Sequence, residues 1–258
     1  MNAEIALPWP VWIATAVTIF IAGFAQGALG FGFPAISAPV LTLMMDVKAA
    51  IVLNLLPNFA VNLYSTLRGG NWRASLGRYW PVAVWVLVGS WAGVSVLLLS
   101  PQEPLRVLLA AVIFFYLYQQ RLARLDWTWL TRYPRLSAAV FGLAGGFFSG
   151  AVNLALPPLL IYFLLLGLEA QAMTQILNLC FLGGKTMQGV MLGAAGAIRL
   201  DAVLANIPLT FVAFGGLLLG QRLQSRFSGA QYQRVLRVAL SVIALLLIGQ
   251  AAWGWWGR

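Results

Sequence analysis

The longest uncharged run in the sequence constrains the fold more than any other feature. The 41 residues from Ile5 to Met45 contain no Asp, Glu, Lys or Arg. At about 1.5 Å per helical residue, this run is roughly 60 Å long, which is twice the ~30 Å thickness of a bilayer hydrocarbon core. The run therefore predicts two membrane passes joined at a break.

The rest of the chain has the same character. Hydrophobic residues make up 61% of it and charged residues 9%, and the mean hydropathy is +0.87, whereas a soluble domain has about 25% charged residues. We therefore expect an all-α polytopic membrane protein. Further passes are expected at Ala49–Leu67, Trp80–Ser100, Val107–Gln120, Leu136–Leu168 (as two short passes), Ala170–Ile198, Ala202–Gly220 and Val238–Trp256.

The two halves of the sequence resemble each other. A shift of 123 positions places Gln26–Pro34 on Ser149–Pro157, and it also places Asn62 on Lys185. Both matched stretches are rich in Gly or Pro, which disfavour a continuous helix. Paired repeats with interrupted helices are a recurrent transporter design. We expect two repeats of about five segments each.

The predicted organisation has three parts. Residues 1–120 form the first membrane repeat, and residues 136–258 form the second. The linker 121–135 mixes four Arg with Trp and Tyr, a composition typical of the cytoplasmic membrane interface.

Positive charge predicts the topology. The chain has 16 Lys and Arg against 6 Asp and Glu, and they lie in short gaps between apolar runs. This pattern indicates cytoplasmic loops rather than a nucleic-acid partner. With five crossings in each half, both termini lie outside and the repeats are inverted. Eleven basic residues then lie inside: Arg68, Arg73, Arg78, four in Arg121–Arg135, Arg222, Arg226, Arg234 and Arg237. A broken pair that re-enters and leaves on one side fits the charge rule equally well.

Lys185 is the most informative single residue. It lies in the middle of the predicted span Ala170–Ile198. A charge at the centre of a membrane helix costs about 2.5–3.5 kcal/mol, so such residues usually face a bundle interior or a wet cavity. The functional interpretation is a counter-charge for a bound anion. The alternatives are a structural ion pair or a Lys that caps the carbonyl groups of a broken helix.

Polar residues form stripes on two matched spans. Asn54, Asn58 and Asn62 recur every four residues and share one helix face. On the matching span the stripe consists of Gln171, Gln175, Asn178, Lys185 and Gln188. The stripes predict a polar path between the halves, and the alternative is hydrogen bonding that holds the helices together.

The helix breaks are candidate anion sites. A helix that begins inside the membrane presents free N–H groups and a positive dipole end. We expect N–H donors at Gly27, Gly30, Gly32 and Gly150, with side-chain donors from Gln26, Ser149 and Asn153. The same small residues also occur as ordinary helix-packing devices.

Composition excludes several other chemistries. The chain has no His and a single cysteine, Cys180, so a Ser–His protease, a zinc site and a disulfide are not expected. We predict no catalytic residues, no metal and no cofactor.

The chain resembles the sulfite exporter TauE/SafE family. The resemblance rests on Gly23–Pro39, the run Ala49–Asn54, the loop Gly70–Arg73, and Gly142–Pro158 leading into Ala172–Lys185. It implies a permease of the bacterial inner membrane that is related to exporters of sulfite and organosulfonates.

These observations together predict an exporter of a small anion. It would work by alternating access around a mid-membrane site formed by Lys185, the Asn stripe and the two breaks. An inside-negative potential favours the exit of each negative charge by about 2.3 kcal/mol per 100 mV. The alternatives are an amino-acid or cation permease, or a non-transporting scaffold subunit. The expected partners are the anion and the lipid bilayer, with a homodimer expected from the habits of membrane carriers.

Overall fold

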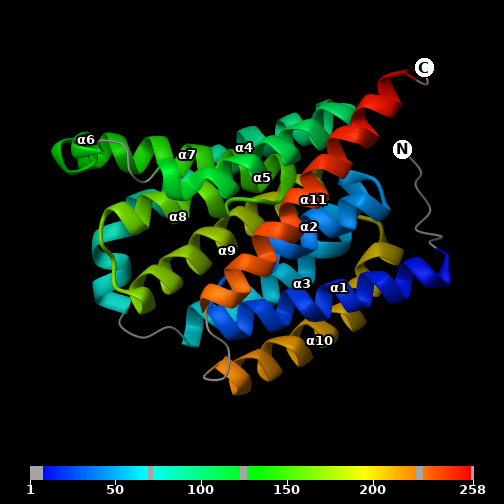
Figure 1. Cartoon of the computed structure of the whole chain (residues 1–258), viewed down its shortest axis with the longest axis horizontal. Coiled ribbons are helices and arrows are strands. Elements are labelled where there is room, and N and C mark those ends of the chain that lie inside the picture. Colours follow the sequence, from blue (N-terminus) through cyan, green and yellow to red (C-terminus); the bar gives the residue numbers. More distant parts are fainter. Residues whose placement is uncertain (1–7, 69–71, 123–126, 225–228, 257–258) are drawn as a thin grey trace.

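The fold is a bundle of helices in two interleaved halves (Figure 1). The computed structural model describes residues 8–68, 72–122, 127–224 and 229–256, and this part of the chain consists of helices and their connections. The helices are α1 (Trp9–Leu29), α2 (Phe33–Met44), α3 (Val47–Arg68), α4 (Trp72–Leu99), α5 (Gln102–Leu122), α6 (Thr128–Arg132), α7 (Pro134–Val152), α8 (Leu156–Leu165), α9 (Ala170–Ala194), α10 (Leu200–Leu223) and α11 (Gly229–Trp256).

Both predicted breaks are present. Between α1 and α2, Gly30 and Gly32 adopt φ values of 83° and 120°, which favour glycine because it has no Cβ. Between α7 and α8, Asn153 adopts φ 61° and ends the helix in the left-handed region. The breaks are narrower than the sequence indicated: Gly27 lies inside α1 and Gly150 inside α7.

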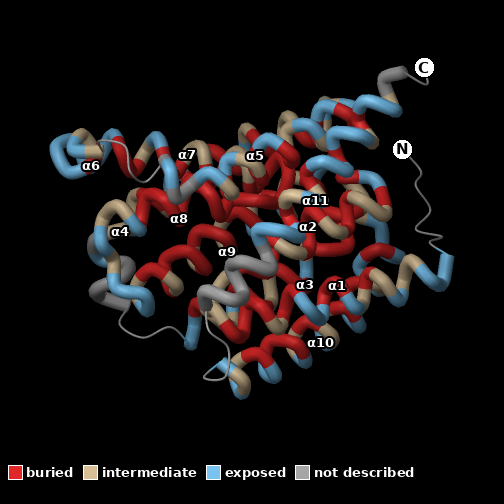
Figure 2. Tube along the Cα trace, in the orientation of Figure 1, coloured by how far each residue is buried: buried red, intermediate tan, exposed pale blue. Residues whose placement is uncertain are grey.

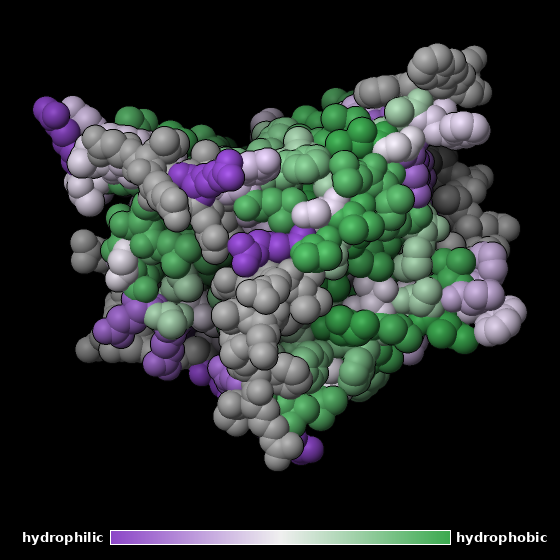
Figure 3. Space-filling view, in the orientation of Figure 1, coloured by the Kyte–Doolittle hydropathy of each residue, from purple (hydrophilic) through white to green (hydrophobic). Residues whose placement is uncertain are grey.

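Six helices of the described chain are long and apolar enough to cross a membrane: α1, α3, α4 (its part Tyr79–Leu99), α7, α10 and α11 (its part Arg237–Gly254). Many large apolar side chains on them are exposed, among them Phe211 and Leu245. The face in Figure 3 is accordingly dominated by hydrophobic residues. The protein is an all-α polytopic membrane protein.

Helix α9 is not among those six because of the polar residues it carries. Four of its polar side chains point into the protein, because Gln175, Asn178, Lys185 and Gln188 are buried, whereas Gln171 of the predicted stripe is exposed. Figure 2 shows that α9 and α3 run through the buried interior of the bundle. A helix surrounded by other helices need not be apolar on every face.

The helices of the two halves pack against each other reciprocally. Helix α1 lies along α10, and α4 lies along α7 in the same way (Figure 1). Glycines make both contacts close: a Cβ on Gly23 would lie 2.2 Å from the carbonyl oxygen of Ala213, and one on Gly146 would lie 2.1 Å from that of Val86. Gly146 follows Gly23 by 123 positions, whereas Ala213 follows Val86 by 127. The segment that runs from α9 into α10 therefore contains four more residues than the equivalent segment from α3 into α4, divided between the helix ends and the connection.

Helices α3 and α9 run in opposite directions. The last residue of α3, Arg68, lines the same cavity as the first residue of α9, Ala170. At the other end, residues 48 and 49 of α3 line a cavity with Leu192 near the end of α9. These equivalent helices of the two halves are therefore inverted relative to each other.

Helix boundaries differ from the sequence prediction mainly at charged ends. Helix α4 begins at Trp72, eight residues before the predicted span, and α5 covers Gln102–Leu122 rather than Val107–Gln120. Hydropathy detects the part of a helix that faces lipid, so polar helix ends are missed. Within the linker, α6 is a short helix, and Trp127 and Trp129 pack against Phe141. Residues 123–126 of the linker lie outside the described residues.

Candidate functional site

A network of side-chain amides joins the two halves at the first helix break. Gln26, in the last turns of α1, donates from Nε2 to Asn178 Oδ1 on α9 at 2.6 Å. The Oε1 atom of Gln26 accepts a hydrogen bond from the backbone N–H of Phe33, the first residue of α2, at 3.0 Å. Asn178 Nδ2 in turn donates to the carbonyl of Gly30 at 2.7 Å. Gln26 and Asn178 thus hold together both sides of the break.

The Asn stripe of α3 continues this network. Gln26 Nε2 also lies 3.5 Å from Asn62 Oδ1 and 3.3 Å from Ser65 Oγ. Asn62 Nδ2 donates to Asn58, and Asn58 Nδ2 donates to Asn153 Oδ1 at 3.3 Å. A chain of amides therefore runs from one helix break to the other.

Asn54 lies apart from this chain. Its Nδ2 donates to Ser37 Oγ on α2 at 2.8 Å, and its Oδ1 has no hydrogen-bond partner within the described chain. Asn54 therefore holds α3 to α2, and its side chain forms no hydrogen bond with the other predicted site residues in the described part of the chain.

Asn153 has an unused donor at the second break. The residue is 1% exposed, and its Nδ2 has no hydrogen-bond partner in the part of the chain that the structure describes. Leaving a buried polar group unsatisfied costs about 1–3 kcal/mol. An incoming acceptor such as an anion oxygen would remove that cost.

Lys185 lies inside the protein, two turns of α9 beyond Asn178. Its side chain is 2% exposed, and Nζ donates to Gln188 Oε1. Gln188 Nε2 donates to the carbonyl of Gly150 at 3.0 Å and lies 3.4 Å from that of Ser149. No carboxylate lies within ion-pair distance of Lys185 among the described residues. Lys185 is therefore linked to the carbonyl groups at the C-terminal end of α7 by hydrogen bonds through Gln188. This arrangement is close to the alternative in which the Lys caps the carbonyl groups of a broken helix.

Ser149 and the glycines of the breaks contribute mostly packing. A Cβ on Gly184 would lie 2.4 Å from Ser149 Oγ, so α9 approaches α7 closely there. Gly27 and Gly150 pack against the carbonyls of Leu217 and Ser90, and both lie inside helices. They do not supply the free N–H groups expected from the sequence, because the helices continue past them. At the helix starts after the breaks, Pro34, Pro157 and Pro158 have no N–H group.

A polar cavity opens beside Gln26. Its volume is about 410 Å³, and we call it the Arg68 cavity. It is lined by Gln26, Gly27, Leu29, Gly30, Ser65, Arg68, Ala170, Gln171, Thr174, Gln221 and Gln224. The lining contains one positive charge and no carboxylate. The sequence prediction missed Arg68 and Gln221 as site residues because they lie at helix ends, where charge and polarity are expected in any membrane protein.

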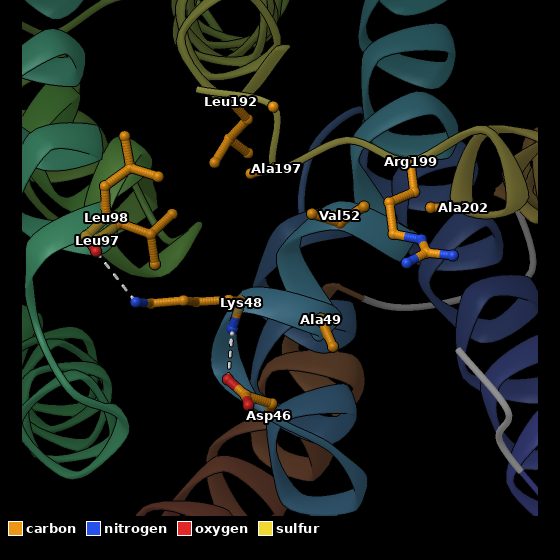
Figure 4. Close-up of a pocket in the computed structure, with 11 residues that line it drawn as sticks. Asp46, Lys48, Ala49, Val52, Leu97, Leu98, Leu192, Ala197, Arg199 and Ala202 are labelled. Carbon is orange, nitrogen blue, oxygen red and sulfur yellow. Dashed lines mark hydrogen bonds between the residues drawn. The ribbon is translucent and has the colours of Figure 1, made fainter. Parts of the chain in front are cut away.

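A smaller cavity lies at the opposite ends of α3, α9 and α10. This Lys48 cavity, of about 100 Å³, is shown in Figure 4 and includes Asp46, Lys48 and Arg199 around apolar residues. Lys48 Nζ donates to the carbonyl of Leu98 at 3.2 Å, and Arg199 pairs with Asp201. Four residues that line this cavity, Val52, Leu97, Leu192 and Ala202, belong to a buried apolar group that we call the Leu97 cluster. It consists of Val47, Ile51, Val52, Val94, Leu97, Leu105, Leu192 and Ala202.

The two faces of the site therefore differ. Gln26 lines the open Arg68 cavity directly, whereas the Leu97 cluster fills the space on the Lys48 side. No group of His, Cys, Asp and Glu that could hold a metal ion occurs among the described residues. The arrangement offers amide hydrogen bonds and two cationic side chains, Arg68 and Lys185, to a solute.

The sequence matches one family model. Residues 15–247 match the model of the sulfite exporter TauE/SafE family. No curated protein and no solved structure matches the chain.

Proposed function

The chain belongs to the sulfite exporter TauE/SafE family and is therefore a membrane transporter of sulfite or related anions; we propose that it exports one small oxyanion by alternating access around the Gln26–Asn178 network. The family match covers nearly the whole described bundle, and members of this family are transporters rather than enzymes. The substrate class we propose is sulfite or an organosulfonate, and the membrane is the bacterial inner membrane.

One observation carries the choice of site. The bond between Gln26 and Asn178 joins the two halves at a helix break, and Gln26 lines an open cavity that contains a positive charge and no carboxylate. A solute in that cavity touches both halves at once. Relative movement of the halves would then change its access from one face to the other.

The amide network can adapt to an anion. Gln26 Nε2 carries two hydrogens but lies within 3.5 Å of four acceptors, namely Gly30 O, Asn62 Oδ1, Ser65 Oγ and Asn178 Oδ1. Gln26 Nε2 can therefore donate a full hydrogen bond to only two of these acceptors at a time, while Gly30 O also accepts from Asn178 Nδ2. Rotation of the Asn62 or Asn178 amide exchanges its oxygen for its NH₂ group. The rotated network would donate hydrogen bonds to the oxygens of a sulfonate or sulfite.

Lys185 supplies charge further along the same path. Asn178 and Lys185 are seven residues apart on α9, which places them on one face about 10 Å apart along the helix axis. Lys185 lines an apolar cavity of about 330 Å³ between α3, α9 and α10, and the Leu97 cluster packs near the ends of the same helices. We propose that the anion first binds at Gln26 and Asn178, then passes Lys185, and leaves the site when the Leu97 cluster separates.

The direction follows from electrostatics. The basic loops place the Arg68 cavity on the cytoplasmic side. An inside-negative potential then drives each unit of negative charge outward with about 2.3 kcal/mol per 100 mV. Export of an anion therefore needs no coupling ion.

The test is efflux from proteoliposomes. Purified protein is reconstituted, and efflux of sulfite, thiosulfate, sulfoacetate and taurine is measured under an imposed inside-negative potential. Potential-dependent efflux of at least one of the anions is expected, with slower efflux of zwitterionic taurine. Efflux of every solute at the rate of protein-free liposomes would overturn the proposal, and a preference for cationic or neutral amino acids would favour the permease alternative.

A further inference from the structure

The Arg68 cavity is polar at positions where the fold does not require polarity. Its helix positions have equivalents in the other half, offset by 123 residues between α1 and α7 and between α3 and α9, or by 127 between α4 and α10, and four of its polar residues have apolar equivalents. The equivalents of Arg68 and Thr174 are Met191 and Ile51. Those of Gln221 and Gln224 are Val94 and Leu97.

These four equivalent positions lie at the closed face of the site, whereas Gln26, Ser65 and Gln171 have the polar equivalents Ser149, Gln188 and Lys48. Ile51, Val94 and Leu97 belong to the buried Leu97 cluster, and Met191 packs against it. The same helix ends can therefore pack with apolar residues. Polar residues around the Arg68 cavity are for this reason better explained by what enters the cavity than by packing.

Arg68 is the charged group of this cavity, and its present partners are neutral. Its Nη1 donates to Gln221 Oε1 and to Tyr64 Oη, the latter at 3.0 Å. The guanidinium also lies 6.0 Å from the centre of the Tyr64 ring. No carboxylate pairs with it in the described chain. A guanidinium presents five N–H donors in a plane, so it retains donors for a ligand.

Gln221 holds the guanidinium at the edge of the cavity. Gln221 lies near the end of α10, and Arg68 is the last residue of α3. A neutral amide oxygen holds a guanidinium less strongly than an oxyanion does, because the oxyanion adds the attraction of opposite charges and can accept two parallel hydrogen bonds from the guanidinium. An oxyanion can therefore displace Gln221 from Arg68.

We propose that the Arg68 cavity is a separate entry site that selects oxyanions before they reach the Gln26–Asn178 network. Arg68 exchanges Gln221 for two oxygens of a sulfonate, sulfite or similar oxyanion, which matches the bidentate geometry of the guanidinium. The bound anion lies in the cavity whose inner wall contains Gln26. This inference rests on the proposed anion transport and adds the residue that recognises charge.

The decisive experiment compares Arg68→Gln with Arg222→Gln in the efflux assay. Arg222 is exposed in the last turn of α10, one residue from Gln221, and does not line the cavity. Both variants lose one positive charge on the same side of the membrane, so a surface effect would be equal in the two. Arg68→Gln is expected to raise the KM for sulfoacetate about tenfold or more, to leave Vmax within about twofold and to reduce the preference for sulfoacetate over taurine.

A second variant tests the exchange of partners. Gln221→Glu would pair Arg68 with a carboxylate and place a negative charge in the cavity. We expect it to raise the KM for sulfoacetate further than Arg68→Gln does, whereas Gln221→Ala removes the competing amide oxygen and should lower the KM. Equal KM values for Arg68→Gln and Arg222→Gln, with wild-type transport intact, would overturn the entry site alone. Absence of wild-type transport would instead reject the proposed function.

Discussion

Gln26 Nε2 and Asn178 Oδ1 lie 2.6 Å apart although 152 positions separate the two residues in the sequence. The first belongs to the helix that ends at one break, and the second belongs to an interior helix of the other half. The bond therefore makes the first break part of the contact between the halves. A solute that replaces this bond necessarily changes how the halves are held together.

The first prediction concerns Gln26. Gln26→Leu keeps the approximate volume but removes the amide, so the network loses the link between α1, α2 and α9. We expect potential-dependent efflux to fall at least about tenfold, because a charge-assisted hydrogen bond is worth about 1.5–3 kcal/mol. The matched control is Thr18→Val, since Thr18 is buried in the same helix and bonds only within it, to the carbonyl of Ala14. Comparable losses in both variants would indicate that α1 stability, rather than binding, explains the effect.

The second prediction concerns Lys185. Removing the ammonium in Lys185→Met should lower efflux at least about tenfold if the anion passes it, whereas Lys185→Arg should retain part of the activity. Gln188→Met separates the two roles of this residue pair: it disrupts the contact with the carbonyl of Gly150 but keeps the charge. The measurement is efflux per folded protein, with folding monitored by thermal unfolding in detergent. A Lys185→Met protein that is destabilised but transports normally would assign Lys185 to structure.

Sequence alone predicted the breaks and the polar stripes of α3 and α9, whose residues Asn62 and Asn178 both lie next to Gln26. Inside a bilayer, backbone N–H and C=O groups must form hydrogen bonds within the protein, so membrane segments are mostly continuous helices. Glycine and proline therefore indicate where such a helix is interrupted. The pairing of Lys185 with Gln188 was not predictable, because helix periodicity places both on one face without saying which of them contact. Gln221 and Arg68 were missed because they meet only through the packing of α3 against α10. Gly27 was assigned to the break wrongly, because the sequence does not distinguish a glycine that allows close helix packing from a glycine that adopts a positive φ in a turn.

The third prediction concerns the close contact of α1 and α10. A Cβ on Gly216 would lie 2.2 Å from the carbonyl oxygen of Phe20, whereas one on the neighbouring Gly215 would meet Phe20 Cε2 at 3.9 Å. Gly216→Ala should therefore destabilise the protein by about 1–3 kcal/mol, the usual cost of overpacking. Gly215→Ala should be neutral or stabilising by up to about 1 kcal/mol, because Ala favours helix over Gly. Thermal unfolding of the two variants in detergent provides the comparison, and equal midpoints would contradict the close contact.

The fourth prediction concerns the Leu97 cluster. Ile51 is 2% exposed within this cluster, and its equivalent in the other half is the cavity residue Thr174. Ile51→Thr removes apolar contact and adds a hydroxyl, which should weaken the closed face. We expect faster efflux with little change in KM, whereas the volume-conserving control Ile51→Leu should behave like the wild type. Slower efflux in Ile51→Thr would show that the cluster does not act as a barrier.

The fifth prediction concerns which face of the membrane each cavity reaches. Cys180 is the single cysteine of the chain and is 0% exposed, so the wild type should react slowly with a membrane-impermeant maleimide. Thr174→Cys places a thiol in the Arg68 cavity, and Ala197→Cys places one in the Lys48 cavity. Because basic loops stay in the cytoplasm, inside-out vesicles should expose Cys at position 174 and right-side-out cells should expose Cys at position 197.

Sulfoacetate should slow the labelling at position 174, since it would occupy the entry site, and should leave position 197 unaffected. Labelling of both positions from the same side would contradict the inverted arrangement on which the direction of export depends.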